Sequence, residues 1–502
     1  MRGNRMSILA MIVVFIALGA ALGLMQWKED AGTSEEVMPL IIEGKEIEET
    51  LEPYIAEEGI YLPYEIIKTY ISDAIELSED AKRIFLPLKG KTVRLEDEKL
   101  TGFIQENEVV VNFPTKDVGG YPYILLSLLE KIEGFNSRID ERERAIVIEK
   151  TDTDQVLNHK REPFTPPKEP INLAWEYVHE KSPNLSDEEK IHALDVIAPT
   201  WFSVVDERGT VINKANKSYV EEAHKKGYQV WALVDNSFKP DLTSKILNDE
   251  ALRKKVIGQL VFYASLYNLD GINVDFENMY YKDKAVFVRF MKELREQIDL
   301  QNLVLSVDIT VPSSSEQWSK VYDRKALGQI VDYVAVMTYD EHWGSSPLSG
   351  SVASIGWVEK GIEKSLELIP EEKMLIGLPF YTRVWREYKD EKGKNKVDSK
   401  AISMARAREI VEEKEAEVVW DEKAGQYFVQ YQEEQDIYKI WLEDPRSISL
   451  KASLVSKYQL AGTAAWRRGF EEQEVWNVLH DMTKKGKKHD ELVFHESFQI
   501  RE

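Results

Sequence analysis

An eight-residue stretch at 270–277, DGINVDFE, places polar side chains at alternate positions. Successive side chains of an extended strand point to opposite faces, so Asn273, Asp275 and Glu277 share one face and apolar residues share the other. Apolar helical patterns flank the stretch at 256–266 and 286–298, which is typical of a parallel βαβ arrangement. Both faces of such a strand are covered, and a buried carboxylate is costly unless it is paired or used. The stretch therefore predicts a functional site rather than a solvent-exposed edge strand.

From residue 171 onward, short apolar segments that read as strands alternate with helical patterns. The segments are 171–177, 196–204, 229–236, 270–277, 303–310, 332–340, 374–385 and 460–468. Eight such strands predict an α/β fold, a closed (β/α)8 TIM barrel over 171–485. An open doubly wound sheet is the alternative, but no glycine fingerprint for a dinucleotide follows an early strand. Alternating aromatic and β-branched residues at about 418–444 predict an α+β insertion between strands seven and eight.

Residues at the ends of several predicted strands are expected to form one site, because barrels of this class place their active site at the carboxyl ends of the strands. These residues are Asp275, Glu277, Met337, Tyr339, Asp340, Tyr381, Arg383 and Trp466. Carboxylates and hydrogen-bonding groups beside aromatic rings suit a sugar, whose ring stacks on indole while its hydroxyls need polar partners.

This set of residues resembles the family 18 glycoside hydrolases. Their strand-four motif, DxxDxDxE, is matched by Asp270, Asn273, Asp275 and Glu277, and their strand-six motif, MxYD, by Met337, Tyr339 and Asp340. The segment 377–385 is similar to the family's strand seven, and Trp466 stands where the family places the tryptophan under a sugar subsite. Within the family, DGINVDFEN is most similar to bacterial enzymes of spore cortex and cell-wall peptidoglycan.

The resemblance implies a catalytic role for three residues. Glu277 is expected to protonate the glycosidic oxygen and then to activate water, while Asp275 orients the 2-acetamido group of the substrate and Tyr339 hydrogen-bonds its carbonyl. The nucleophile then belongs to the sugar, which is an exception to the two-carboxylate scheme. The resemblance also implies a substrate-binding set, which consists of Asn273, Asp270, Met337, Asp340, Tyr381, Arg383 and Trp466.

Asn273 departs from the family pattern, which more often has Asp at this position. Asparagine can hydrogen-bond Asp275, but it can neither carry a charge nor take a proton. We therefore expect an altered pH optimum rather than loss of activity, because Glu277 is present.

The resulting hypothesis is an enzyme that cleaves β-linked N-acetylglucosaminyl bonds of peptidoglycan, including that of spore cortex. A hydrolase of chitin or chitooligosaccharides is the first alternative. A catalytically silent carbohydrate-binding barrel is the second, and the presence of Glu277 argues against it.

Composition excludes several other classes of function. The 502 residues carry a net charge of −23, whereas nucleic-acid binding needs a basic face. The absence of cysteine excludes disulfides, thiolate zinc sites and a cysteine nucleophile. We expect no metal and no cofactor, a polysaccharide as partner, and a monomer.

The first residues predict the compartment. Arg2 and Arg5 precede an apolar run at 8–25, which is long enough to cross about 30 Å of hydrocarbon as a helix. A cleaved signal peptide is the alternative, but no small-residue cleavage site follows, and Trp27 suits a membrane interface. We expect an uncleaved signal anchor at 1–27, a single-pass location in the cell membrane and an extracytoplasmic body.

The segment 37–150 contains a weak internal repeat and predicts a small α+β domain. Each copy has an aromatic-proline turn, a short helix and a strand, with the turns at 61–64 and 121–123. This layout loosely resembles the N-terminal domain of copper amine oxidase. A proline-rich linker at 151–170 and a tail at 486–502 complete the predicted organisation.

Overall fold

Eight strands form a parallel sheet that closes on itself in this computed structural model, which describes residues 38–88, 94–95, 98–151, 156–157, 162 and 164–494. The strands are β14 (Ile171–Glu176), β15 (Val196–Val204), β17 (Gln229–Asp235), β18 (Gly271–Asp275), β19 (Val304–Thr310), β20 (Tyr333–Met337), β21 (Met374–Pro379) and β27 (Gly462–Trp466). Each pairs in parallel with the next in this order, and β14 pairs with both β15 and β27. The prediction of a closed eight-stranded barrel is confirmed.

Gly462 permits the closure at β14. A Cβ atom at this residue would lie 1.9 Å from the carbonyl oxygen of Ile171, and its φ of +147° is one that L side chains rarely adopt. Any other residue would therefore push the first and last strands of the barrel apart.

Alternate side chains of the strands build two separate cores. Inside the barrel, apolar side chains such as Leu173, Trp231, Leu233 and Tyr333 fill the space below the carboxyl ends of the strands. Outward-facing side chains such as Ile272 pack against the surrounding helices. The sequence alternates with period two because each strand faces both cores.

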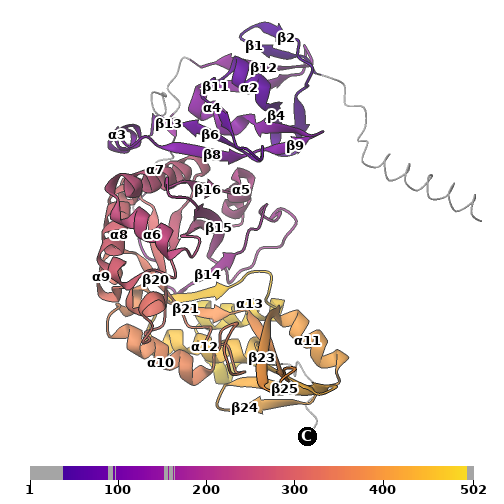
Figure 1. The fold of residues 1–502 in the computed structure, drawn as a ribbon, viewed down its shortest axis with the longest axis vertical. Coiled ribbons are helices and arrows are strands. Elements are labelled where there is room, and N and C mark those ends of the chain that lie inside the picture. The colour runs from indigo at the N-terminus through magenta and orange to yellow at the C-terminus, as the bar shows by residue number, and fades with distance from the viewer. Residues whose placement is uncertain are drawn as a thin grey trace, which may run out of the picture.

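Helices connect the strands and cover the outside of the barrel (Figure 1). They are α5 (Lys217–Lys225), α6 (Pro240–Asn248), α7 (Glu250–Tyr267), α8 (Lys284–Asp299), α9 (Arg324–Ile330), α10 (Ile355–Leu366), α12 (Pro445–Tyr458) and α13 (Gln473–Leu479). A short strand, β16 (Val211–Asn213), pairs in antiparallel orientation with the carboxyl end of β15.

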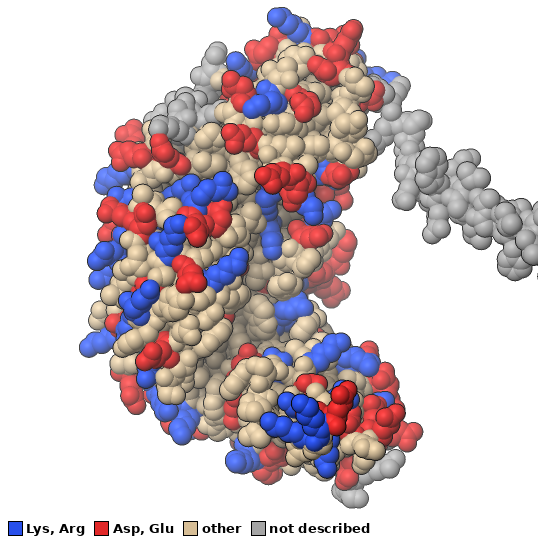
Figure 2. Space-filling model, in the orientation of Figure 1, with Lys and Arg blue, Asp and Glu red and all other residues tan. Residues whose placement is uncertain are grey.

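The insertion between β21 and β27 is larger than the expected range of 418–444. It is a five-stranded antiparallel sheet with one helix, and it begins directly after β21. Its elements are β22 (Tyr381–Lys389), β23 (Asn395–Ser403), α11 (Met404–Glu413), β24 (Val418–Asp421), β25 (Gln426–Glu433) and β26 (Asp436–Leu442). The apolar pattern of 374–385 spans two strands of different sheets, so sequence periodicity joined them into one. Figure 2 shows a notch between the barrel and the lobe that contains this insertion.

The N-terminal part is a small α+β domain of short sheets, as predicted. Its elements are β1 (Leu40–Ile42), β2 (Lys45–Ile47), β3 (Tyr54–Ala56), β4 (Gly59–Pro63), α2 (Tyr64–Tyr70), β5 (Glu76–Leu77), β6 (Arg83–Pro87), β7 (Arg94–Leu95), α3 (Glu98–Glu106), β8 (Val110–Pro114), β9 (Lys116–Val118), β10 (Tyr121–Leu125), α4 (Leu126–Glu133), β11 (Phe135–Asp140), β12 (Ala145–Lys150) and β13 (Val156–Leu157). The predicted aromatic-proline turns are wrong, because β4 and β10 pair as antiparallel strands, each followed directly by a helix.

The N-terminal domain docks on the barrel through a buried polar cluster. Asn112 of β8 is fully buried; its backbone N–H donates to Tyr263 Oη at 2.8 Å and its amide donates to the Val211 carbonyl at 2.7 Å. Arg83 donates two bonds to the Asn213 carbonyl, at 2.9 and 2.8 Å. Gly258 of α7 permits the approach, since a Cβ there would lie 2.5 Å from Val109. The two parts therefore share a packed interface.

The predicted signal anchor at 1–27 lies outside the described residues, as do residues 495–502 of the predicted tail and residues 152–155, 158–161 and 163 of the linker. Within the described part of the chain, no helix combines the length and apolar character needed to span a bilayer.

Candidate active site

Glu277 stands two residues beyond the end of β18, and the barrel holds its backbone from the neighbouring strand. The side chain of Asn236, directly after β17, accepts the Glu277 N–H at 3.1 Å and donates to its carbonyl at 2.7 Å. Tyr322 donates its hydroxyl to the carbonyl of the preceding residue, Phe276, at 2.9 Å. These three bonds fix the direction of the Glu277 side chain at the mouth of the barrel.

Asn273 lies in the centre of a buried polar network. Its carbonyl oxygen accepts the Trp175 indole N–H at 2.9 Å, and its amide donates to Ser306 Oγ at 2.9 Å and to Asp308 Oδ1 at 2.8 Å. Both amide hydrogens are thereby used, and the expected bond from Asn273 to Asp275 is absent among the described contacts. Asp275 Oδ1 is instead buried without a hydrogen-bond partner in the described part of the chain.

Burial is the main cause of the unusual acidity of the carboxyl groups. It raises the pKa of Glu277 to about 7, and the negative charge of Asp340 adds to this shift. Burial also raises the pKa of Asp275 well above its usual value, with the charges of Glu277 and Asp308 as further causes. A glutamic acid that keeps its proton near neutral pH is suited to donate it to a leaving group.

The end of β20 supplies a second group of site residues. Tyr339 lies edge-on to the rings of Trp175 and Tyr381, at centroid distances of 6.4 and 6.1 Å. Tyr381 donates its hydroxyl to Asp340 Oδ1 at 2.6 Å, and Arg383 Nη2 lies 3.6 Å from the same oxygen. The half-buried Met337 ends the strand. The insertion therefore brings two of its β22 side chains to the end of β20.

Aromatic side chains lie at the same end of the barrel as the acidic groups. Trp466, at the end of β27, lies 6.1 Å from Trp175 in centroid distance, and it is partly exposed. Further large aromatic side chains that are about half exposed follow five different barrel strands, and they are Tyr177, Phe238, Tyr281, Trp318 and Trp343. Exposed rings at the same end of a barrel as a polar centre suit a carbohydrate ligand.

Asp270 lies at the opposite end of β18 from Glu277. Its Oδ2 accepts the backbone N–H of Val230 at 2.8 Å and lies 2.7 Å from Nε2 of His224. The substrate contact expected for Asp270 does not fit this position, because five residues of strand span about 16 Å. Its contacts instead join α5 and β17 to the start of β18.

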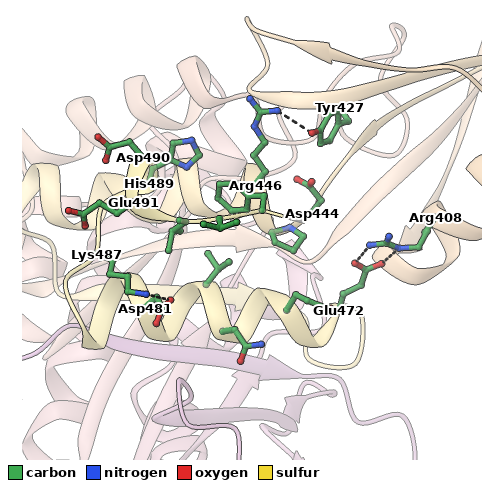
Figure 3. A pocket seen from close by; sticks show the side chains of 17 residues that line it. Arg408, Tyr427, Asp444, Arg446, Glu472, Asp481, Lys487, His489, Asp490 and Glu491 are labelled. Carbon is green, nitrogen blue, oxygen red and sulfur yellow. Dashed lines mark hydrogen bonds and ion pairs between the residues drawn. The ribbon is translucent and has the colours of Figure 1, made fainter. Parts of the chain in front are cut away.

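Two other kinds of site were considered, a metal site and a cavity away from the strand ends. Among the described residues, no group of three or more His, Asp or Glu side chains could hold a metal ion. A cavity of about 1110 Å³ lies beside α12 and α13 (Figure 3), but it shares no residue with the strand-end site. Charged side chains in this cavity pair with one another, as in Arg408 with Glu472 and Lys487 with Asp481.

Comparison with known proteins identifies the barrel. The model of the family "Glycosyl hydrolases family 18" matches residues 235–471. The chain contains a family 18 glycosyl hydrolase domain. The match includes the acidic stretch of β18, the end of β20 and Trp466, so the resemblance inferred from these residues is confirmed for this domain, which is consistent with a glycoside hydrolase.

Several bacterial glycosylases are similar to the family 18 domain. The uncharacterized glycosylase YvbX of Bacillus subtilis is 26% identical over 303 residues, which cover 58% of this chain and 85% of that protein. The cortical fragment-lytic enzyme of B. subtilis is 28% identical over 253 residues, but these cover only 58% of its length. The crystal structure of the spore cortex-lytic enzyme SleL of Bacillus megaterium matches with a TM-score of 0.56 and 25% identity, covering 64% of this chain and 76% of that one.

Sequence reasoning missed several residues that shape the family 18 site: Trp175, Asn236, Asp308 and Tyr322. Only Asp308 could have been recognised from a pattern in the sequence. Ser306, Asp308 and Thr310 alternate with apolar residues on β19 in the same way as the polar residues of β18 do. The other three act through contacts to strands far away in the chain.

Activity of the family 18 domain should fall as pH rises through the ionisation of Glu277. Since the acid form must donate a proton and its pKa is about 7, kcat/KM should decline about tenfold per pH unit above this value. Asp340→Asn should move this limb to lower pH by about half a unit to one unit, because it removes a neighbouring negative charge. A pH–rate profile of both proteins measures the effect, and identical alkaline limbs would refute the assignment to Glu277.

Proposed function

We propose that this protein cleaves β-linked N-acetylglucosaminyl bonds of peptidoglycan by substrate-assisted, retaining catalysis. The observation that carries the proposal is the contrast between Glu277 and Asp275. Glu277 is a partly buried acid whose pKa burial raises to about 7, whereas Asp275 has a buried oxygen that no described donor satisfies. A buried acceptor without a hydrogen-bond donor destabilises the protein. A donor on the bound ligand would remove this penalty. The N–H of a 2-acetamido group is such a donor.

In this mechanism Glu277 protonates the glycosidic oxygen while the acetamido carbonyl oxygen attacks the anomeric carbon. Asp275 accepts the acetamido N–H, and the Tyr339 hydroxyl donates to the carbonyl. Glu277, now ionised, takes a proton from water, which opens the cyclic intermediate at the same carbon. Two inversions at that carbon leave its configuration unchanged.

Peptidoglycan is favoured as the substrate by the similar proteins. Two of the matches described above are named for action on spore cortex or its fragments. The exposed aromatic rings beyond five of the strand ends provide surface for several sugars of one glycan strand.

The substrate is tested by digesting purified peptidoglycan and chitin with the full-length protein and identifying the new reducing ends. We expect N-acetylglucosamine at the reducing ends released from peptidoglycan. Preferential cleavage of chitin would establish the chitinase alternative. Binding of both polymers without release of fragments would support the silent carbohydrate-binding barrel.

We also propose that residues 1–27 anchor the protein in the cell membrane with the body extracytoplasmic. Their apolar run is long enough to span the bilayer. Deletion of residues 1–35 should release the protein from the membrane fraction and leave its specific activity unchanged. Fractionation of cells that express both forms measures this, and persistent membrane association of the shortened chain would contradict the role of the segment.

A further inference from the structure

A turn directly after β27 carries two consecutive arginines at the mouth of the barrel. The backbone N–H of Arg468 donates to the Trp175 carbonyl of β14 at 2.9 Å, so the turn remains bonded to the neighbouring strand. The Phe470 N–H closes the turn on the Arg467 carbonyl at 3.1 Å, and the Phe470 carbonyl accepts the N–H of Met404, the first residue of α11, at 2.9 Å. These bonds fix the turn between the barrel and the insertion.

The two arginines differ in their partners. Arg468 is buried, and its guanidinium is paired with the carboxylate of Glu176 at 2.8 Å and with that of Glu188. Arg467 is partly exposed, and within the described part of the chain its guanidinium forms neither a hydrogen bond nor an ion pair. Arg468 therefore joins segments of the barrel, whereas the charge of Arg467 is available to a ligand.

The carboxylates nearest to Arg467 are bonded to other donors. Glu176 accepts from Arg468, as described above, and Glu471 accepts the backbone N–H of Phe470 at 3.0 Å and an indole N–H at 2.9 Å. Burial lowers the pKa of the Arg467 guanidinium more than the charges of Glu176 and Glu471 raise it. An arginine keeps its charge at neutral pH even so. A ligand anion would offset the loss of hydration that accompanies this burial.

Two aromatic rings hold the Arg467 guanidinium in place. Its central carbon lies 3.9 Å from the ring centroid of Phe470 and 5.2 Å from that of Tyr177, a ring that is 49% exposed. A guanidinium held over rings is pre-organised, and its planar set of N–H groups matches a carboxylate. Tyr177 follows β14, on which Trp175 contacts Trp466. Arg467 therefore lies beside the subsite whose sugar Trp466 is expected to support.

We propose that Arg467 binds a carboxylate carried by the sugar next to the one above Trp466, and so distinguishes peptidoglycan from uncharged glycans. This inference rests on the proposed function, in which the cleaved position holds N-acetylglucosamine and its neighbours along the strand are N-acetylmuramic acids. Muramic acid carries a lactyl ether on O3, whose carboxyl group is either free or bonded to a peptide that has carboxylates of its own. Chitin has no carboxylate. Arg467 is thus a specificity-determining residue and takes no part in bond cleavage.

The test compares three glycans with the same alternating sugars: one with free lactyl carboxylates, one with these groups capped as methylamides, and one with peptides attached to them. Binding is measured to the full-length Glu277→Gln protein, with and without Arg467→Gln, so that turnover does not interfere. Loss of a charge-assisted contact should weaken binding of a carboxylate-bearing glycan about 10- to 100-fold, with little effect on the methylamide. The glycan that is affected identifies whether the lactyl group or the peptide supplies the carboxylate.

Two further variants make the result specific. Arg467→Lys should retain part of the affinity, because an ammonium keeps the charge but lacks the planar fork. Lys282→Gln is the matched control, since Lys282 is an exposed cation that also lies over a ring, 5.0 Å from the centroid of Tyr280, in the turn after β18. It should leave binding of all three glycans unchanged.

Equal losses for the charged and the capped glycans on Arg467→Gln, or no loss for any of them, would overturn the role of Arg467. With Glu277 intact, Arg467→Gln should raise KM for the charged glycan and leave kcat unchanged, because the contact is the same in the ground state and the transition state. Failure of the wild type to cleave peptidoglycan would contradict the proposed function instead. The binding measurements decide on Arg467 in either case, since they need no cleavage.

Discussion

Replacement of Glu277 by glutamine should reduce turnover about 10²- to 10⁴-fold while substrate binding is preserved. Glutamine has nearly the same shape, and the backbone bonds that hold this residue come from Asn236 and so do not depend on its side chain. It has no proton to donate to the glycosidic oxygen and cannot then activate water. Steady-state kinetics on a soluble N-acetylglucosaminyl oligosaccharide, with binding measured separately, would show the loss in kcat.

Glu316→Gln is a suitable control for this substitution. Glu316 is an exposed glutamate that begins a short helical turn (Glu316–Lys320) after β19, at the same end of the barrel. The control variant should retain full activity. Near-normal turnover of Glu277→Gln would show that another group is the acid.

A substrate with a free 2-amino group should be cleaved several orders of magnitude more slowly than its N-acetylated counterpart. Intramolecular nucleophiles that are well positioned reach effective molarities of about 10⁵ to 10⁸ M, and the protonated amine has no carbonyl oxygen with which to attack. The protonated amine also places a positive charge beside Asp275, where the N-acetylated substrate has a neutral amide N–H. Comparison of initial rates for the two forms of one oligosaccharide measures the difference.

Two further observations accompany this result if the acetamido group is the nucleophile. The first product released should retain its anomeric configuration. A thiazoline that mimics the cyclic intermediate should inhibit more strongly than substrate binds, because the site is complementary to the transition state. Fast cleavage of the free amine, or an inverted product, would show that a protein group or water attacks directly.

The sequence by itself determined the barrel and indicated the main members of its candidate site. All eight predicted strands are present, and seven of them lie within a few residues of their expected limits, whereas the segment 374–385 joins β21 to the first strand of the insertion. Each barrel strand faces a core on both sides, so its composition indicates that burial locally. Glu277 and Asp275 were recognisable because two residues on one strand share a face, which is a property of neighbours in the chain. Tyr339, Asp340 and Trp466 followed from the rule that strand ends meet.

Only the tertiary structure decided which groups bond to one another within the site. The Trp175 indole reaches Asn273 from 98 residues away, and Asp308 reaches it from 35. No periodicity within either strand records such a bond, so the sequence suggested a bond from Asn273 to Asp275 instead. The same limit applies to Asp270, whose type fits a motif although it directly precedes β18 and contacts His224. Residue types and spacing thus specify which side chains each strand directs into the site. The register and closure of the sheet specify which of these side chains, from different strands, contact one another.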